Sequence, residues 1–90
     1  MRFARVDANQ TAIVSALRAA GATVQSLAVI GKGCPDILVA SASGEMFLLE
    51  LKHGKGKTNE LQQKWHAAWN APVHVVYGPE DALKAIGAIK

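Results

Sequence analysis

Two short apolar runs separated by a turn-like segment stand out in the middle of the chain. Ile37–Ala40 is wholly apolar, and Met46–Lys52 begins apolar and ends in charged residues. The intervening residues 41–45 include Gly44, which adopts a positive φ without steric cost. Two apolar runs joined by such a segment predict a β-hairpin.

The hairpin pattern also predicts which residues face each other. If Ala40 lies opposite Met46, the antiparallel register places Asp36 opposite Glu50, with both side chains on the same face. Lys52 lies two residues beyond Glu50 and therefore shares that face. A slip of one residue would send Asp36 to the opposite face, so the grouping depends on this register.

The other periodic segments predict three helices and two further strands. In chain order they are a helix that ends before Gly21, a strand over Val24–Ile30, the hairpin, a helix after Thr58, a strand over Val73–Tyr77 and a last helix opened by Pro79. The order α-β-β-β-α-β-α predicts an α/β (α+β) fold with a mixed central sheet flanked by helices, covered on both faces.

Polar residues mark the predicted helix starts. Asp7 and Gln10 have the spacing of a capping box, which favours Asp7 as an N-cap over Asp7 as a catalytic acid. Gln10 either caps the same helix or reaches the charged end of the hairpin. Thr58 is the predicted N-cap of the helix that follows the hairpin.

The chemistry of the charged cluster favours a metal site. Two carboxylates at one point, Asp36 and Glu50, repel each other unless a proton or a cation intervenes, and hard oxygen ligands suit Mg²⁺ or Mn²⁺. The backbone carbonyl of Leu51 is a candidate third ligand. Such an ion activates water towards a phosphoryl group, with Lys52 orienting the water or stabilising negative charge. The alternative is a solvated acid and lysine at a strand end.

At this point the chain resembles the PD-(D/E)XK nuclease superfamily, and within it the small stand-alone VRR-NUC type domain of phage-like proteins. The resemblance covers nearly the whole chain, from the helix that ends at Gly21 through the segments 33–36 and 50–52 to the helix that carries Gln62 and Trp69. It implies a restriction-endonuclease-like fold over a single nuclease domain, residues 1–90.

The resemblance also implies roles for individual residues. Asp36 and Glu50 would bind the divalent metal, Lys52 would be the catalytic lysine, and Gln62 would be an accessory catalytic residue. The superfamily often carries an additional glutamate on its first helix, where this chain has Gln10. A neutral amide is a poorer metal ligand than a carboxylate, so this departure bears on how strongly a metal is held.

Composition and charge fit one domain with an anionic partner. The 90 residues are 50% hydrophobic, which suffices for a single core, and no apolar run is long enough to span a membrane. We expect a cytoplasmic protein. Its formal charge is +3, and exposed basic residues near the cluster are candidate DNA contacts or simply solvated. These are Lys32, His53, Lys55 and Lys57.

Several conspicuous side chains have a structural interpretation. Cys34, the one cysteine, is expected to be a small turn residue, not a nucleophile. The spacing of Trp65 and Trp69 predicts core anchors, with base stacking as the alternative. His66 is expected to be a surface histidine, with phosphate contact or proton transfer as the alternative.

Together these patterns predict an Mg²⁺- or Mn²⁺-dependent DNA endonuclease. The resemblance implies a homodimer that acts on branched DNA such as four-way junctions, encoded by a phage. The alternatives are a catalytically weak or inactive DNA-binding module with the same fold, and a small structural protein whose basic loop contacts another protein.

Overall fold

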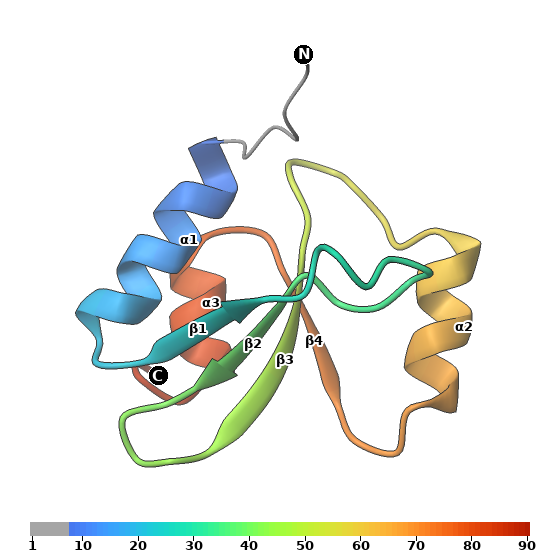
Figure 1. Ribbon diagram of the computed structural model, residues 1–90. Helices are drawn as coiled ribbons and strands as arrows, with labels where there is room; N and C mark the ends of the chain where they lie inside the picture. The colour runs from blue at the N-terminus through green and yellow to red at the C-terminus, as the bar shows by residue number, and fades with distance from the viewer. Residues whose placement is uncertain (1–7) are drawn as a thin grey trace.

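The computed structural model describes residues 8–90, and the predicted N-cap Asp7 lies outside them. Three helices and four strands follow each other in the predicted order, which confirms the mixed α/β class (Figure 1). They are α1 (Ala8–Ala19), β1 (Thr23–Ser26), β2 (Ile37–Ala40), β3 (Met46–Leu51), α2 (Glu60–Ala68), β4 (Val73–Val76) and α3 (Pro79–Ala85).

The four strands form one mixed sheet in the order β1-β2-β3-β4. The first three are antiparallel neighbours, and β4 pairs in parallel with β3 because the crossover through α2 reverses the chain. Ala40 lies opposite Met46, which confirms the predicted hairpin register. The pairing ends at Ile37 and Leu49, and the backbone N–H of Asp36, just before β2, still donates to the carbonyl of Leu49 at 3.1 Å.

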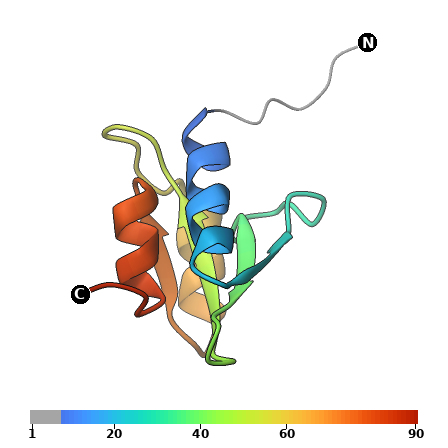
Figure 2. The same cartoon turned by 90° about the vertical axis from the view of Figure 1, so that its left-hand side faces the viewer.

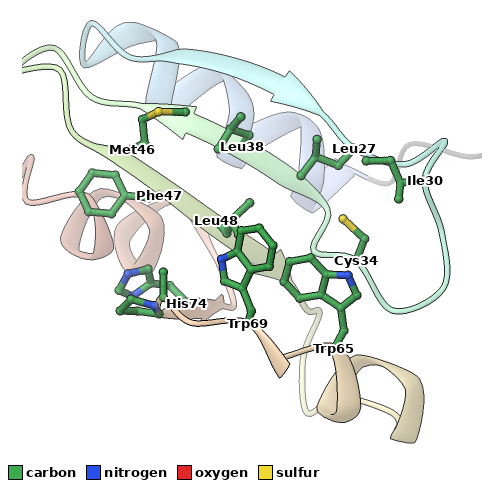
Figure 3. A pocket seen from close by; sticks show the side chains of 12 residues that line it. Leu27, Ile30, Cys34, Leu38, Met46, Phe47, Leu48, Trp65, Trp69 and His74 are labelled. Atoms are coloured by element: carbon green, nitrogen blue, oxygen red, sulfur yellow. The ribbon is translucent and has the colours of Figure 1, made fainter. Parts of the chain in front are cut away.

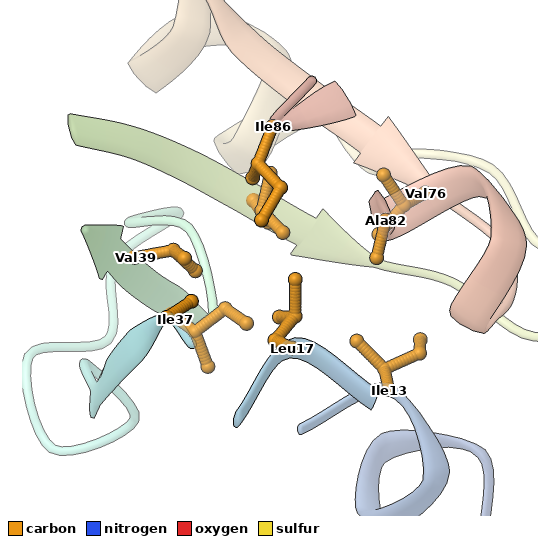
Figure 4. Packing of buried hydrophobic residues seen from close by; sticks show 9 residues of the cluster. Ile13, Leu17, Ile37, Val39, Val76, Ala82 and Ile86 are labelled. Carbon is orange, nitrogen blue, oxygen red and sulfur yellow. The ribbon is translucent and has the colours of Figure 1, made fainter. Parts of the chain in front are cut away.

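One face of the sheet carries the hydrophobic core beneath α1 and α3, which lie together on that side (Figures 1 and 2). Side chains of the two helices and of the sheet meet there (Figure 4). The buried set is Ile13, Leu17, Ala22, Ile37, Val39, Leu49, Val76, Ala82 and Ile86. Because strand side chains alternate, burying Ile37 and Leu49 turns Asp36 and Glu50 to the opposite face.

That opposite face is only partly covered, which corrects the expectation of a sheet covered on both sides. Helix α2 lies over it, but none of the residues Glu60–Ala68 is buried. A groove of about 580 Å³ remains between α2 and the sheet, with Leu38 and Leu48 on its floor (Figure 3). Trp65 and Trp69 stack on each other along its wall, with ring centroids 4.8 Å apart.

The predicted core role of the tryptophans is therefore wrong for Trp69, whose side chain is 49% exposed. Its position follows from the loose packing of α2, because a helix with no buried residue cannot carry a core anchor. The apolar stripe that the sequence shows on this helix faces a groove that the single chain leaves open.

Two predicted boundaries also differ from the structure. The first strand ends at Ser26 and the chain turns over the next four residues, because β2 offers only four residues for pairing. Helix α2 is capped by Asn59, not by Thr58. The capping box requires a polar residue three positions after the cap, and Gln62 meets this requirement for Asn59, whereas Leu61 follows Thr58 at that spacing.

Within residues 8–90, no helix is long and apolar enough to cross a membrane.

Candidate active site

The two acids of the site are placed by the ends of β2 and β3. Pro35 is buried and directly precedes Asp36, whose Oδ2 accepts a 2.6 Å hydrogen bond from the backbone N–H of Leu51. In a strand the N–H and C=O of one residue point to the same side, so the Leu51 carbonyl also faces the Asp36 edge. The hairpin thus holds one carboxylate and one carbonyl next to Glu50.

Glu50 is the one buried charged residue among residues 8–90, with 1% of its surface exposed. The pKa of Glu50 is raised from 4.5 to about 8, first by burial and then by a hydrogen bond with Asp36 and the negative charge of Asp36, whereas Lys52 lowers it. Ionising Glu50 is unfavourable because it leaves a desolvated negative charge beside a second carboxylate. A cation bound at this position would stabilise the ionised form.

Gln62 of α2 connects the acid and the lysine. Its Nε2 donates to Glu50 Oε2 at 2.9 Å, and its Oε1 accepts from Lys52 Nζ at 2.7 Å. The same Oε1 accepts from the backbone N–H of Asn59, as part of the helix cap. The cap therefore fixes the amide orientation, and the amide in turn fixes two charged side chains of β3 and the residue after it.

Lys52 is held close to the acids. Its Nζ lies 3.7 Å from Glu50 Oε2, and only 14% of its side chain is exposed. Asn9 of α1 donates from Nδ2 to the Lys52 carbonyl and to the Tyr77 carbonyl, both at 3.1 Å. These two hydrogen bonds connect the ends of β3 and β4, and no sequence pattern predicts them. Gln10, the predicted supporting residue of α1, is half-buried, and its role stays a prediction.

His66 is the residue of the site that sequence analysis placed wrongly. Its side chain is 19% exposed, not a surface group, and its Nε2 lies 3.5 Å from Glu50 Oε1. Burial lowers its pKa below the ordinary value, and the charge of Lys52 lowers it further, so the ring is neutral at pH 7. The available signal was its position one helical turn after Gln62, on a neighbouring part of the same helix surface.

The predicted DNA contacts lie on two loops, one before β2 and one after β3. Lys32, His53, Lys55 and Lys57 are all exposed. A turn closed by the Gly56 N–H and the His53 carbonyl shapes the loop after β3, and the Tyr77 hydroxyl donates to the Gly56 carbonyl at 3.0 Å. The loop is thus tethered to the end of β4, an ordering that its glycine-rich sequence does not predict.

The donor set fits a divalent metal ion. Glu50 Oε1 is buried and has no hydrogen-bond partner in the part of the chain that the structure describes. Two carboxylates beside one lysine leave an excess negative charge when both are ionised. Within residues 8–90, no three side chains of His, Cys, Asp or Glu gather as a ligand cluster. An ion would therefore depend on Asp36, Glu50, the Leu51 carbonyl and water.

Comparison with known proteins agrees with this arrangement. No family model and no curated protein matches the chain. Among solved structures, one described as a VRR_NUC domain is similar to it, with a TM-score of 0.70 and 28% sequence identity, covering 86% of this chain and 88% of the other. This similarity supports a VRR-NUC type domain within the PD-(D/E)XK superfamily, and it agrees with the resemblance predicted from the motifs.

The four predicted catalytic residues lie together. Asp36 directly precedes β2, Glu50 and Lys52 lie in β3 and directly after it, and Gln62 lies on α2. Hydrogen bonds or close charges join them. Cys34 is half-buried nearby, and burial and the two carboxylates raise the pKa of its thiol. A neutral thiol agrees with a turn residue and not with a nucleophile.

Gly33 allows the loop before β2 to approach α2 closely. It has a φ of +87°, and a Cβ there would collide with the Leu61 carbonyl, one residue before Gln62. We expect Gly33→Ala to displace the start of α2, to lower the stability by at least about 2 kcal/mol and to reduce cleavage. Gly31→Ala is the matched control, because Gly31 has a φ of +64° but open space around it.

Urea unfolding and cleavage assays on both variants separate the two effects. The backbone cost of a positive φ is common to both, so the excess loss in Gly33→Ala measures the contact with α2. Equal stability and equal cleavage in the two variants would contradict this role of Gly33.

Proposed function

We propose that this VRR-NUC type domain is a nuclease, and specifically an endonuclease that hydrolyses DNA phosphodiester bonds with Mg²⁺ or Mn²⁺. The observation that carries the proposal is the buried Glu50, which stands beside Asp36 and Lys52 and has one carboxylate oxygen without a hydrogen-bond partner among residues 8–90. A buried carboxylate beside a second acid destabilises the fold, so its presence is best explained by a function.

In this proposal Asp36, Glu50 and the Leu51 carbonyl hold the metal. When bound, the ion supplies positive charge at the phosphoryl oxygens and makes its bound water more acidic. Lys52, held by Gln62, orients the attacking water or stabilises the negative charge that develops on the phosphate. Gln62 acts as an accessory residue by fixing the direction of Lys52 and Glu50 through its two hydrogen bonds.

The exposed basic residues would hold the DNA backbone on either side of the cleaved bond. Lys55 and Lys57 lie on the loop tethered by Tyr77, His53 begins this loop, and Lys32 lies on a separate loop. Contacts to phosphates alone give an affinity that falls steeply with salt and little sequence preference. We therefore infer recognition of DNA shape, such as branched DNA and four-way junctions, and not of a long sequence.

A homodimer would supply the second active site that cleavage of two strands requires. The open groove supports this part of the proposal, because it is lined almost entirely by apolar side chains and continues into the exposed side chains of Ile30, Met46 and Trp69. Apolar surfaces of this kind mark interaction sites. We propose that a second copy of this chain covers the groove.

The dimer makes a direct prediction. The wild type should sediment at twice its 9.5 kDa mass at micromolar concentration. Met46→Lys should shift it to the monomer, because the charge would be buried in the interface while the side chain is 65% exposed in the single chain. Ala12→Lys adds the same charge on the exposed side of α1 and should remain dimeric. A wild type that is monomeric throughout would refute the dimer.

The substrate is tested with a panel of labelled single-stranded, duplex, flap and four-way junction DNA in Mg²⁺, Mn²⁺ or EDTA. We expect cleavage that requires a divalent metal and is fastest on the branched substrates. Equal rates on duplex and junction would remove the branch selectivity from the proposal. Salt-sensitive binding with no cleavage in any metal would favour the catalytically inactive DNA-binding module instead.

A further inference from the structure

Two buried polar atoms without hydrogen-bond partners in the described part of the chain face each other between α2 and β3, one from His66 and one from Glu50. His66 Nε2 and Glu50 Oε1 are both buried, and neither has a hydrogen-bond partner within residues 8–90. They are separated by 3.5 Å. Orphaned buried polar atoms are costly, and two that face each other point to a missing common partner.

The distance fits a hydrogen bond or a shared water poorly. It exceeds the range of about 2.7 to 3.2 Å for a good hydrogen bond. It is also short for a bridging water, because two groups held by one water at about 2.8 Å stand about 4.5 Å apart at the tetrahedral angle. Neither a direct contact nor a shared water accounts well for the observed 3.5 Å.

A metal ion between the two atoms would satisfy both of them. Two ligands with bonds of about 2.1 Å stand about 3.0 Å apart at the right angles of an octahedral ion, so the two atoms would close by about 0.5 Å on binding. The lone pair of a neutral imidazole is a common metal ligand, and the other Glu50 oxygen is fixed by Gln62 at 2.9 Å. Oε1 is therefore held in the direction of His66.

We propose that His66 Nε2 is a nitrogen ligand of the divalent metal, which it shares with Glu50 Oε1. Asp36, the Leu51 carbonyl, water and a substrate oxygen would supply the remaining ligands, because the side chains of residues 8–90 do not form a preformed cluster of three ligands. The consequence is a preference among metals. Imidazole binds Mn²⁺ more strongly than Mg²⁺, so the site selects Mn²⁺ more than an all-oxygen site would. This inference rests on the proposed metal-dependent function.

The metal contact is tested in the wild type by nuclear magnetic resonance of histidine side chains labelled with ¹⁵N. Addition of MnCl₂ below one equivalent broadens signals close to the ion. We expect the His66 imidazole signals to disappear first, before those of His53 and His74. Broadening of His66 no stronger than that of His74 would overturn the proposal.

The ligand role is tested by calorimetric titration of Mn²⁺ and Mg²⁺ into the wild type, His66→Ala and His74→Ala. We expect His66→Ala to weaken Mn²⁺ binding about tenfold or more and Mg²⁺ binding much less, so that the preference for Mn²⁺ falls. Alanine is the residue most favourable to a helix, so the substitution should keep α2 intact. His74→Ala should bind both metals like the wild type.

The outcomes distinguish this inference from the proposed function. Unchanged Mn²⁺ and Mg²⁺ affinities in His66→Ala, with a wild type that binds metal and cleaves DNA, would overturn the role of His66 and leave the nuclease in place. A wild type that neither binds Mn²⁺ nor cleaves DNA would overturn both.

Discussion

Asp36→Ala is expected to lower the rate of DNA cleavage on the order of a thousandfold or more, because it removes a proposed metal ligand from the site. DNA binding should stay equal or become tighter, since the variant lacks one negative charge near the phosphates. Single-turnover cleavage and a binding titration in Ca²⁺ or EDTA measure the two effects separately.

Two further variants control for other causes. Asp36→Asn keeps an oxygen that accepts the Leu51 N–H, so it tests the charge without removing the hydrogen bond. Glu45→Ala removes an exposed carboxylate from the hairpin turn and should cleave like the wild type. Substantial cleavage by both Asp36 variants would exclude Asp36 as a metal ligand.

Glu50→Gln is expected to make the metal-free protein more stable at alkaline pH while abolishing cleavage. The pKa of Glu50 is about 8 in the folded chain, against an ordinary value of 4.5. Between these values the folded state holds a proton that the unfolded state has released, so the stability of the wild type falls as pH rises, by up to about 1.4 kcal/mol per unit. Glutamine does not titrate and avoids this loss.

The gain should therefore be near zero at about pH 4.5 and reach roughly 2 to 4 kcal/mol above pH 8. Urea unfolding in EDTA at pH 5, 7 and 8.5 measures it, and Glu60→Gln serves as the control because Glu60 is 75% exposed. If the gain of Glu50→Gln shrinks with rising pH, or if this variant is less stable than the wild type at pH 8.5, the pKa of Glu50 is not raised in the folded state. Stability given up at an active site is a common cost of function.

The parts of the site that follow from local geometry could be predicted from the sequence. The apolar runs and Gly44 determine a hairpin register, and this register alone brings Asp36, Glu50 and Lys52 to one face. Gln62 was implied by the family resemblance, and the structure joins it to Glu50 and Lys52.

The parts that depend on how helices pack could not be predicted. The apolar spacing of α2 suggests a buried helix, but the spacing does not show that α2 stands away from the sheet and leaves Trp69 half exposed. The position of His66 beside Glu50 follows from the same packing. The hydrogen bonds of Asn9 span 43 and 68 residues, a separation at which no local pattern carries information.

The central claim is that the acidic pair and Lys52 form a metal-dependent site for DNA hydrolysis. The most direct test is cleavage of one labelled four-way junction by the wild type, Asp36→Ala and Lys52→Ala, each in Mn²⁺ and in EDTA. The account predicts cleavage by the wild type in Mn²⁺ alone and none by either variant. Cleavage that persists in EDTA, or in both variants, would contradict it.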